Sequence, residues 1–436
     1  MKNIKKTLSI IICLSLLLSL SVSAFAADYQ HTGFRKLDLR LNGESFPLKA
    51  LDASYTNNTY VSLRSLAEAL DGTSKQFNIE FNSTPGDGDY FSITTGGKYT
   101  VPDKSLDEET IEEDIYLSLY RNRLFKDGNE LRYYTYRFGD PEDLYMSLTD
   151  IQLVFDFLAF STDGKILRLY PDKPFSVSFR ELKNSGYFDV INSVLVGDSR
   201  SGKIIFSSRA DESFPVASTS KLMNYVLIRE ALERGEISLE DQVVLSSNAV
   251  ALSKSEDGLI TMAEGQTAPV SELITGMLVA SSNECALALA EHVAGSEESF
   301  VQAMNYRAAE LGLTGSEFIN CNGLPKVSAG TIPVKRQNKM TAEDLFILAS
   351  YILNSFPDIT NITSQQFASM KSLDYTTANS NPLVFNIGAT GLKTGSTIAS
   401  GQCVVACDGS GKIVIVLGAE DGAIRGRAAE LLFKAK

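Results

Sequence analysis

Strand-like segments stand at both ends of residues 187–436, and helical patterns fill the stretch between them. Residues 194–196 and 204–206 are apolar runs on either side of a turn near the start. Residues 401–407 and 413–417 form a second such pair near the end. Strands from both ends of one segment can pair into a single sheet that carries the helices as an insert. We therefore predict an α/β domain with an antiparallel sheet built from its two termini.

Three short motifs follow one another inside this domain. They are Ser218-Thr219-Ser220-Lys221, Ser281-Ser282-Asn283 and Lys393-Thr394-Gly395. Together they supply a nucleophile with a lysine beside it, a second hydroxyl with an amide, and a cation for a carboxylate. The only histidines of the chain are His31 and His292. This combination indicates a serine acyl-transfer enzyme that works without histidine.

The first motif pairs Ser218 with Lys221. We read residues 216–232 as a helix, and residues three apart on a helix share a face, so the ammonium can reach the hydroxyl. Apolar residues after Lys221 leave its charged form poorly solvated, which lowers the pKa of the lysine. A neutral lysine can take the proton of Ser218, and N–H groups at a helix N-terminus can stabilise an oxyanion. Ser218 is therefore the candidate nucleophile and Lys221 its base.

The second motif places Ser281 and Asn283 after an apolar helix. A hydroxyl there can pass a proton to the leaving group, and the amide can fix a substrate carbonyl. Residues 246–248 repeat the Ser-Ser-Asn pattern, but they lie in a polar turn and read as a helix cap. We therefore assign this part of the site to Ser281 and Asn283.

The third motif and the residue after it are the candidate substrate-binding group. Lys393 can offer its charge to a substrate carboxylate, and Thr394 can offer a hydroxyl. Gly395 has no side chain to block a peptide that lies along the strand edge. Ser396 can lend a backbone N–H to an oxyanion hole.

The ordered motifs resemble those of the penicillin-binding proteins and serine β-lactamases. Their surroundings resemble the low-molecular-mass D-alanyl-D-alanine carboxypeptidases, over residues 214–223, 289–298, 311–320, 323–325 and 391–395. The resemblance implies the β-lactamase-like fold, an acyl-enzyme on Ser218 and removal of the terminal D-alanine from peptidoglycan stem peptides. It also implies that β-lactam antibiotics are covalent inhibitors.

The chain departs from the family pattern at several positions. Ser282 stands where the family usually has Gly, Glu284 where it has Asp, and Ser396 where it often has an aromatic residue or His. Two alternatives stay open. A β-lactamase would share the first chemical step, although Glu317 lacks the Glu-x-x-Leu-Asn context of class A enzymes. A wall-binding scaffold with an inactive C-terminal domain is the non-enzyme alternative.

The first 26 residues have the pattern of a secretory signal peptide. Three lysines precede an apolar run over residues 8–22, and Ala24-Phe25-Ala26 supplies the small-x-small cleavage pattern. An uncleaved membrane anchor is the alternative, because the run approaches spanning length. We therefore expect a secreted, extracytoplasmic protein that is associated with the cell wall.

Residues 29–172 contain a weak tandem repeat. The turn signals Asn42-Gly43 and Asp127-Gly128 have the same offset as the helix starts at residues 60–63 and 145–148 (127 − 42 = 85 and 145 − 60 = 85). One register therefore aligns both signals, which predicts two copies of a strand-turn-strand-helix-strand unit in a smaller α+β domain. Chance alignment is the alternative.

The first copy resembles the copper amine oxidase N-terminal-like modules of secreted proteins, through residues 41–43 and 60–70. The resemblance implies a spacer, or a module that binds the cell wall or an envelope partner. It does not imply copper, because His31 is the only imidazole in this half. Residues 173–186 read as a linker to the catalytic domain over 187–436.

Charge and cysteine content exclude other classes of function. The formal net charge of −13 argues against nucleic acid as a partner, because phosphate binding needs clustered Lys and Arg. Without a C-x-x-C pair and with so few histidines, no metal site and no cofactor are predicted. Cys403 and Cys407 would share one face of a strand, which indicates core packing. The compartment permits a disulfide among the four cysteines beyond the signal segment, but the sequence does not select a pair: Cys285, Cys321, Cys403 and Cys407.

Overall fold

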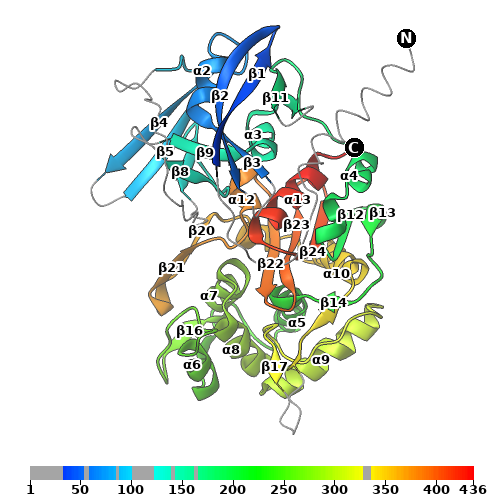
Figure 1. Ribbon diagram of the computed structural model, residues 1–436. Coiled ribbons are helices and arrows are strands. Elements are labelled where there is room, and N and C mark those ends of the chain that lie inside the picture. The colour runs from blue at the N-terminus through cyan, green and yellow to red at the C-terminus, as the bar shows by residue number, and fades with distance from the viewer. Residues whose placement is uncertain are drawn as a thin grey trace. The chain divides into compact units, whose positions relative to one another are not determined.

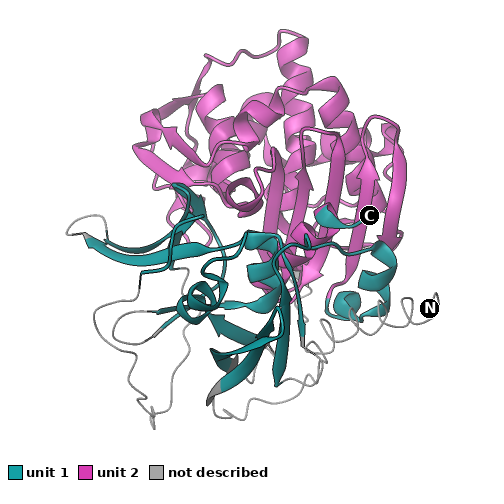
Figure 2. Ribbon diagram, turned by 90° about the horizontal axis from the view of Figure 1, so that it is seen from above, with its two compact units in different colours: residues 1–190, 434–436 teal, residues 191–433 magenta. Residues whose placement is uncertain are grey.

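The structure is a computed structural model that describes residues 33–53, 58–84, 88–100, 122–138, 143–161, 165–327 and 335–436. The chain divides into two compact units, residues 1–190 with 434–436 and residues 191–433 (Figure 2). The predicted signal peptide over residues 1–26 and the residue His31 lie outside the described residues. No helix in the described part of the chain is both long enough and apolar enough to cross a membrane.

The second unit is built on a five-stranded antiparallel sheet that takes strands from both ends of the unit (Figure 1). Its order is β13-β12-β24-β23-β22, so the first two strands pair with the last three, as the sequence predicts. Buried side chains fill the middle of β12 and β24 on both faces, which matches their unbroken apolar sequence. The strands are β12 (Ser193–Asp198), β13 (Lys203–Ser208), β22 (Gly391–Thr397), β23 (Gly401–Cys407) and β24 (Lys412–Ala419).

Helices fill the stretch between the two groups of strands (Figure 1). One of them, α10, packs against β12 and β24, while α13 lies over the opposite face of the sheet (Figure 1). The helical elements are η3 (Ala217–Ser220), α5 (Lys221–Glu233), α6 (Ser247–Ser253), α7 (Val270–Thr275), η4 (Gly276–Ala280), α8 (Asn283–Ala294), α9 (Glu297–Glu310), α10 (Ala342–Ser355), α11 (Ile359–Thr363), η5 (Lys371–Leu373), α12 (Leu383–Asn386) and α13 (Gly422–Lys434).

Four short strand pairs complete this unit and brace its loops. They are β14 (Phe214–Pro215) with β19 (Lys339–Met340), β15 (Gln242–Val244) with β16 (Thr267–Pro269), β17 (Lys326–Val327) with β18 (Lys335–Arg336), and β20 (Phe367–Met370) with β21 (Tyr375–Ala378).

The core of the second unit joins α5 and α8 to the sheet. On α5, most apolar side chains are fully buried, and Leu227 and Leu232 are partly buried, which is the pattern of a helix largely enclosed by protein. Cys403 and Cys407 are buried in the same core on β23, so the predicted packing role of these two thiols is confirmed.

The first unit contains a seven-stranded sheet and a four-stranded sheet. The larger sheet has the order β10-β11-β1-β2-β3-β9-β8, and the smaller one has β4-β5-β6-β7. The strands are β1 (Gly33–Leu41), β2 (Glu44–Ala53), β3 (Asn58–Ser62), β4 (Phe77–Thr84), β5 (Gly88–Thr95), β6 (Arg123–Lys126), β7 (Asn129–Leu131), β8 (Tyr136–Phe138), β9 (Asp143–Ser147), β10 (Leu158–Ser161) and β11 (Ile166–Tyr170).

Two short helices of the first unit begin in the same way. Ser62 caps α2 (Leu63–Leu70) by accepting the N–H of Ser65 at 3.0 Å. Ser147 caps α3 (Leu148–Phe155) by accepting the N–H of Asp150 at 3.2 Å. A serine before each helix therefore satisfies one of its free N–H groups.

The segment that the sequence assigns to a linker, residues 173–186, contains a helix. α4 (Phe179–Asn184) is held by a capping box, in which Ser178 and Glu181 bond to each other's backbone N–H. A 3-10 turn, η2 (Tyr187–Val190), follows and belongs with the first unit. The linker is therefore structured, because its Ser-x-x-Glu pattern starts a helix.

Candidate active site

Ser218 lies on a 3-10 turn rather than inside an α-helix. The predicted helix over 216–232 is divided, since η3 carries the nucleophile and the α-helix α5 begins only at Lys221. Ala217 is left-handed, with φ of 47°, and the hydroxyls of Thr219 and Ser220 donate to the carbonyls of Val216 and Ala217 at 2.8 Å. These side-chain bonds hold a tighter turn than an α-helix would make.

Lys221 is fully buried and points its ammonium at Ser218. Its Nζ donates to Ser218 Oγ at 2.7 Å, to Asn283 Oδ1 at 2.8 Å and to the carbonyl oxygen of Asn322 at 2.8 Å. Burial lowers the pKa of Lys221 to about 7. The first and second motifs therefore meet at this nitrogen, and near neutral pH the lysine is close to losing its proton.

The carbonyl of Asn322 is a part of the site that sequence reasoning missed. It accepts from Lys221, and Ser218 Oγ also donates to it at 3.3 Å. Gly323 follows, and a Cβ there would lie 2.2 Å from the carbonyl oxygen of Ala217. The signal in the sequence that could have indicated this contact is Gly323, because glycine permits a close approach of one backbone segment to another.

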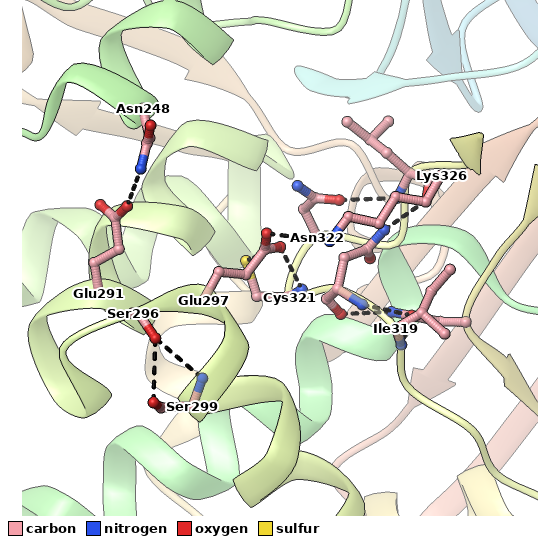
Figure 3. Close-up of polar contacts among 12 residues, drawn as sticks. Asn248, Glu291, Ser296, Glu297, Ser299, Ile319, Cys321, Asn322 and Lys326 are labelled. Carbon is pink, nitrogen blue, oxygen red and sulfur yellow. Dashed lines mark hydrogen bonds and ion pairs between the residues drawn. The ribbon is translucent and has the colours of Figure 1, made fainter. Parts of the chain in front are cut away.

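Buried amides and one carboxylate fix the segment that carries Asn322. Asn338 Nδ2 donates to Ser220 Oγ at 3.0 Å and to the carbonyl oxygen of Asn320 at 2.9 Å. Glu297 accepts the N–H of Cys321 at 3.1 Å and pairs with Lys326 at 3.6 Å (Figure 3). These contacts brace the turn beside the nucleophile, so the carbonyl of Asn322 is held by the fold.

Ser281 and Asn283 lie on either side of a helix start. Ser281 ends the π-helical turn η4 in the left-handed conformation, with φ of 66°. Ser282, which replaces the usual Gly of the family, caps α8 by accepting the N–H of Cys285 at 3.0 Å. Asn283 Nδ2 donates to the carbonyl oxygen of Asp257 at 2.9 Å, so its amide joins Lys221 to a neighbouring loop.

Lys393 lies on the edge strand β22 and is 1 % exposed. Its Nζ donates to Ser281 Oγ at 2.7 Å and to the carbonyl oxygen of Thr394 at 2.8 Å. Burial, followed by the positive charges of Lys221 and Arg425, holds the pKa of Lys393 well below its usual range. The second and third motifs therefore meet at Ser281.

Ser380 is a second residue that the sequence analysis missed. Its Oγ lies 2.8 Å from Thr394 Oγ1, and its N–H donates to the carbonyl oxygen of Val279 at 3.1 Å. The segment before α12 thus places another hydroxyl against the third motif. No sequence pattern around Ser380 predicts this contact, because it depends on how the segment before α12 folds back against β22.

The structure shows a second reason for glycine at position 395, beside the predicted room for a peptide. A Cβ there would lie 2.8 Å from the carbonyl oxygen of Val216 and 2.9 Å from the backbone nitrogen of Ser218. The missing side chain therefore lets β22 pack against the backbone of the nucleophile turn. Ser396 follows on the same strand with an exposed side chain.

Two residues weighed in the sequence analysis lie away from these contacts. Ser246 caps α6 by accepting the N–H of Ala249 at 3.1 Å, so the second Ser-Ser-Asn pattern is a helix cap, as predicted. Glu317 is half-exposed and pairs with Arg336, and its backbone bridges to Lys339. Neither residue has a described contact with Ser218 or Lys221.

The four described cysteines are free thiols: Cys285, Cys321, Cys403 and Cys407. Within the described ranges, no group of three or more His, Cys, Asp or Glu side chains is arranged to hold a metal ion. The groups gathered at the site are hydroxyls, amides and two buried lysines, which suit acyl transfer through a serine.

Comparison with known families agrees with this geometry. The family described as Peptidase_S11, D-alanyl-D-alanine carboxypeptidase, matches residues 190–421, more than half of the chain. The chain belongs to this family. The matched residues include all three motifs, Asn322 and Ser380.

Among curated relatives, D-alanyl-D-alanine carboxypeptidase DacF of Bacillus subtilis (strain 168) is 32% identical over 224 residues, which are 50% of this chain and 54% of the relative. The carboxypeptidase DacC of Escherichia coli (strain K12) is 30% identical over 248 residues, 54% of this chain and 58% of the relative. The chain therefore spans little more than half the length of these relatives.

Two solved structures share the fold. A peptidoglycan synthesis regulatory factor (PBP3) from Streptococcus pneumoniae has a TM-score of 0.52 at 27% identity, over 56% of this chain and 70% of that one. D-alanyl-D-alanine carboxypeptidase DacD from Francisella tularensis has a TM-score of 0.50 at 24% identity, over 56% and 69%, and shows the fold alone. The predicted α/β fold of the penicillin-binding proteins is therefore confirmed for this part of the chain.

Proposed function

We propose that this protein is a serine-type D-Ala-D-Ala carboxypeptidase that removes the terminal D-alanine from peptidoglycan stem peptides. One observation carries the proposal: a fully buried lysine, Lys221, lies 2.7 Å from the Oγ of Ser218. Burial brings the pKa of that lysine to about 7, so a neutral amine is available to take the hydroxyl proton.

Acylation starts at Ser218. As Lys221 takes the Oγ proton, Oγ attacks the carbonyl carbon of the bond between the two D-alanines, and a new ester bond forms. The C–N bond breaks, and the proton taken up by Lys221 passes to the leaving amine, which we assign to delivery through the hydroxyl of Ser281. Lys221 is then neutral again. Lys393 and Thr394 hold the terminal carboxylate. This carboxylate supplies a negative charge beside the buried ammonium of Lys393.

Deacylation returns the enzyme to its starting state. Lys221 takes a proton from water, the hydroxide attacks the ester carbonyl, and Ser218 regains its proton as the shortened peptide leaves. A β-lactam follows the same first step, because its strained amide replaces the scissile bond and stays attached to the ester product. Slow water attack on that ester makes the drug a covalent inhibitor.

Labelling with a fluorescent penicillin tests the proposal. We expect the wild-type protein to form a covalent adduct and to release D-alanine from a pentapeptide, and Ser218→Ala to lose both activities. Ser246→Ala is the matched control, because it removes a serine from the other Ser-Ser-Asn pattern, where it caps α6 and donates to Glu291. A folded wild-type protein that neither labels nor releases D-alanine would contradict the proposal.

A β-lactamase activity is the second candidate, and the surroundings of Glu317 disfavour it. A class A enzyme uses a glutamate to activate the deacylating water. Here Glu317 is half-exposed and pairs with Arg336. We therefore expect slow nitrocefin turnover, and rapid turnover would reverse the order of the two candidates.

We also propose that the first unit is a tandem repeat of the copper amine oxidase N-terminal-like kind. Equal spacing supports it, because the capped helices α2 and α3 begin at residues 63 and 148 and end at residues 70 and 155. The proposed role is contact with the cell wall or an envelope partner. Sedimentation with purified peptidoglycan tests this role, and equal binding by a variant without residues 29–172 would contradict it.

Export is proposed on the residue pattern of the first 26 positions. The expected mature protein begins at Ala27, after the small-x-small site, and is found outside the cytoplasmic membrane, associated with the wall. Mass spectrometry of the N-terminus distinguishes this protein from a retained anchor, which would keep residues 1–26.

A further inference from the structure

Glu284 is a fully buried carboxylate that directly follows the second motif. Its Oε1 accepts the N–H of Leu259 at 2.9 Å and the N–H of Ile260. Its Oε2 is buried and has no hydrogen-bond partner among the described residues. Buried carboxylates are normally paired and fully hydrogen-bonded, so this group requires an explanation.

One part of the explanation is the loop between α6 and β16. Asn283 holds the carbonyl of Asp257, and Glu284 holds the N–H groups of Leu259 and Ile260. Two consecutive residues of α8 therefore fasten residues 257–260 beside the second motif. Leu259 is 44% exposed and Ile260 is fully buried in the core, so the hydrogen bonds to Glu284 and Asn283 act together with the burial of Ile260 in holding this loop.

The second part of the explanation is charge. The ionisable groups whose charges act on Lys221 are Cys321 on the neighbouring turn, Glu284 and Cys285 on α8, and Lys393 on β22. Burial raises the pKa of both thiols, so they are neutral near pH 7, and Lys393 can only add positive charge. Glu284 is therefore the group that can supply a negative charge to Lys221.

We propose that Glu284 is a positioning residue of the acyl-transfer site, whose buried carboxylate fixes the loop 257–260 and supplies the negative charge that balances Lys221. This inference rests on the proposed function. Glu284 also lies in the first turn of α8, where a negative charge interacts favourably with the helix dipole. A purely structural role of that kind would not change the pKa of Lys221, whereas the proposed role does.

The test is the pH dependence of acylation by a fluorescent penicillin, from about pH 5 to pH 9. In the wild type we expect the rate to fall as the pH drops through about 7, because only neutral Lys221 accepts the Ser218 proton. Glu284→Gln keeps an acceptor oxygen for the loop but removes the charge. Losing a nearby negative charge favours the neutral lysine, so this acid limb should move to lower pH.

Glu291→Gln is the matched control. Glu291 lies on the same helix, and its carboxylate accepts from Asn248 at 3.0 Å (Figure 3) and from Ser246 at 2.5 Å. We expect its acid limb to coincide with that of the wild type. A movement in Glu291→Gln as large as in Glu284→Gln would overturn the assignment to Glu284.

Glu284→Asp separates the two roles and serves if Glu284→Gln fails to fold. It keeps the charge but shortens the reach to the loop, so we expect an unmoved acid limb and an acylation rate lower by about tenfold. An unmoved limb in folded Glu284→Gln, or an unchanged rate in Glu284→Asp, would overturn the proposal. A wild-type protein that is never acylated would instead contradict the proposed function.

Discussion

Lys221 and Lys393 are two buried lysines of one site, and their surroundings differ. Lys221 is fully buried, donates to three oxygens and lies near the carboxylate of Glu284. Lys393 is also buried and donates to two oxygens, but the charges that shift its pKa are the positive ones of Lys221 and Arg425. The two lysines are therefore suited to different roles, Lys221 to proton transfer and Lys393 to binding a carboxylate.

The difference concerns charge rather than burial. Removing an ammonium from water costs free energy, and a nearby negative charge offsets part of that cost. At Lys221 the offset leaves a pKa of about 7, which suits a base that gains and loses a proton in each cycle. At Lys393 the missing anion is one that a substrate carboxylate can supply, so we expect substrate binding to favour the protonated form of Lys393.

The largest expected effect is that of Lys221→Met. Methionine fills a similar volume without the amine, so we expect acylation to fall by about 10³-fold or more while the fold is kept. The measurement is the second-order rate of penicillin labelling, with thermal unfolding as the check on folding. Lys203→Met, on an exposed lysine of β13, is the control. If the labelling rate of folded Lys221→Met fell by less than about tenfold, Lys221 would not be the base, and the proposed difference between the two lysines would be wrong.

A smaller and more selective effect is expected from Lys393→Met. Loss of the cation that meets a buried carboxylate costs about 3 kcal/mol, or roughly 10²-fold in kcat/KM for a pentapeptide. The same peptide with an amidated C-terminus lacks the carboxylate, so the variant and the wild type should process it at similar low rates. An equal loss of kcat/KM on both peptides would mean that Lys393 does not bind the terminal carboxylate.

Local spacing accounts for what the sequence predicted correctly. Ser218 and Lys221 meet because residues three apart share a face, whether the turn is α-helical or 3-10. Strands from both ends of residues 187–436 share one sheet, and the apolar runs of β12 and β24 are buried there, while that of β13 lies at the edge and is largely exposed. The helix in the linker was also readable from Ser178 and Glu181, whose spacing forms a capping box.

Contacts between distant segments account for what the sequence did not predict. The carbonyl of Asn322 reaches Lys221 across 101 residues, and a backbone oxygen carries no side-chain signature. The close approach of Gly395 to the backbone of the nucleophile turn was likewise not predicted, because it depends on how β22 packs against η3. Glu284 was noticed only as a departure from the family pattern, because its loop partners depend on how α6 and α8 are placed.

The smallest expected effect is that of Ser380→Ala, beside the residues that bind the substrate carboxylate. Ser380 Oγ lies 2.8 Å from Thr394 Oγ1, so removing it should free the threonine hydroxyl to rotate away from a bound carboxylate. A hydrogen bond of this kind contributes about 1 kcal/mol, which predicts that Ser380→Ala raises KM about fivefold and leaves the penicillin acid limb unmoved. Ser369→Ala is the control, because Ser369 makes a similar hydroxyl pair with Thr376 at 3.1 Å on an exposed hairpin. If Ser380→Ala instead moved the acid limb, the two lysines would share one polar network, and the division between a base and a carboxylate receptor would have to be abandoned.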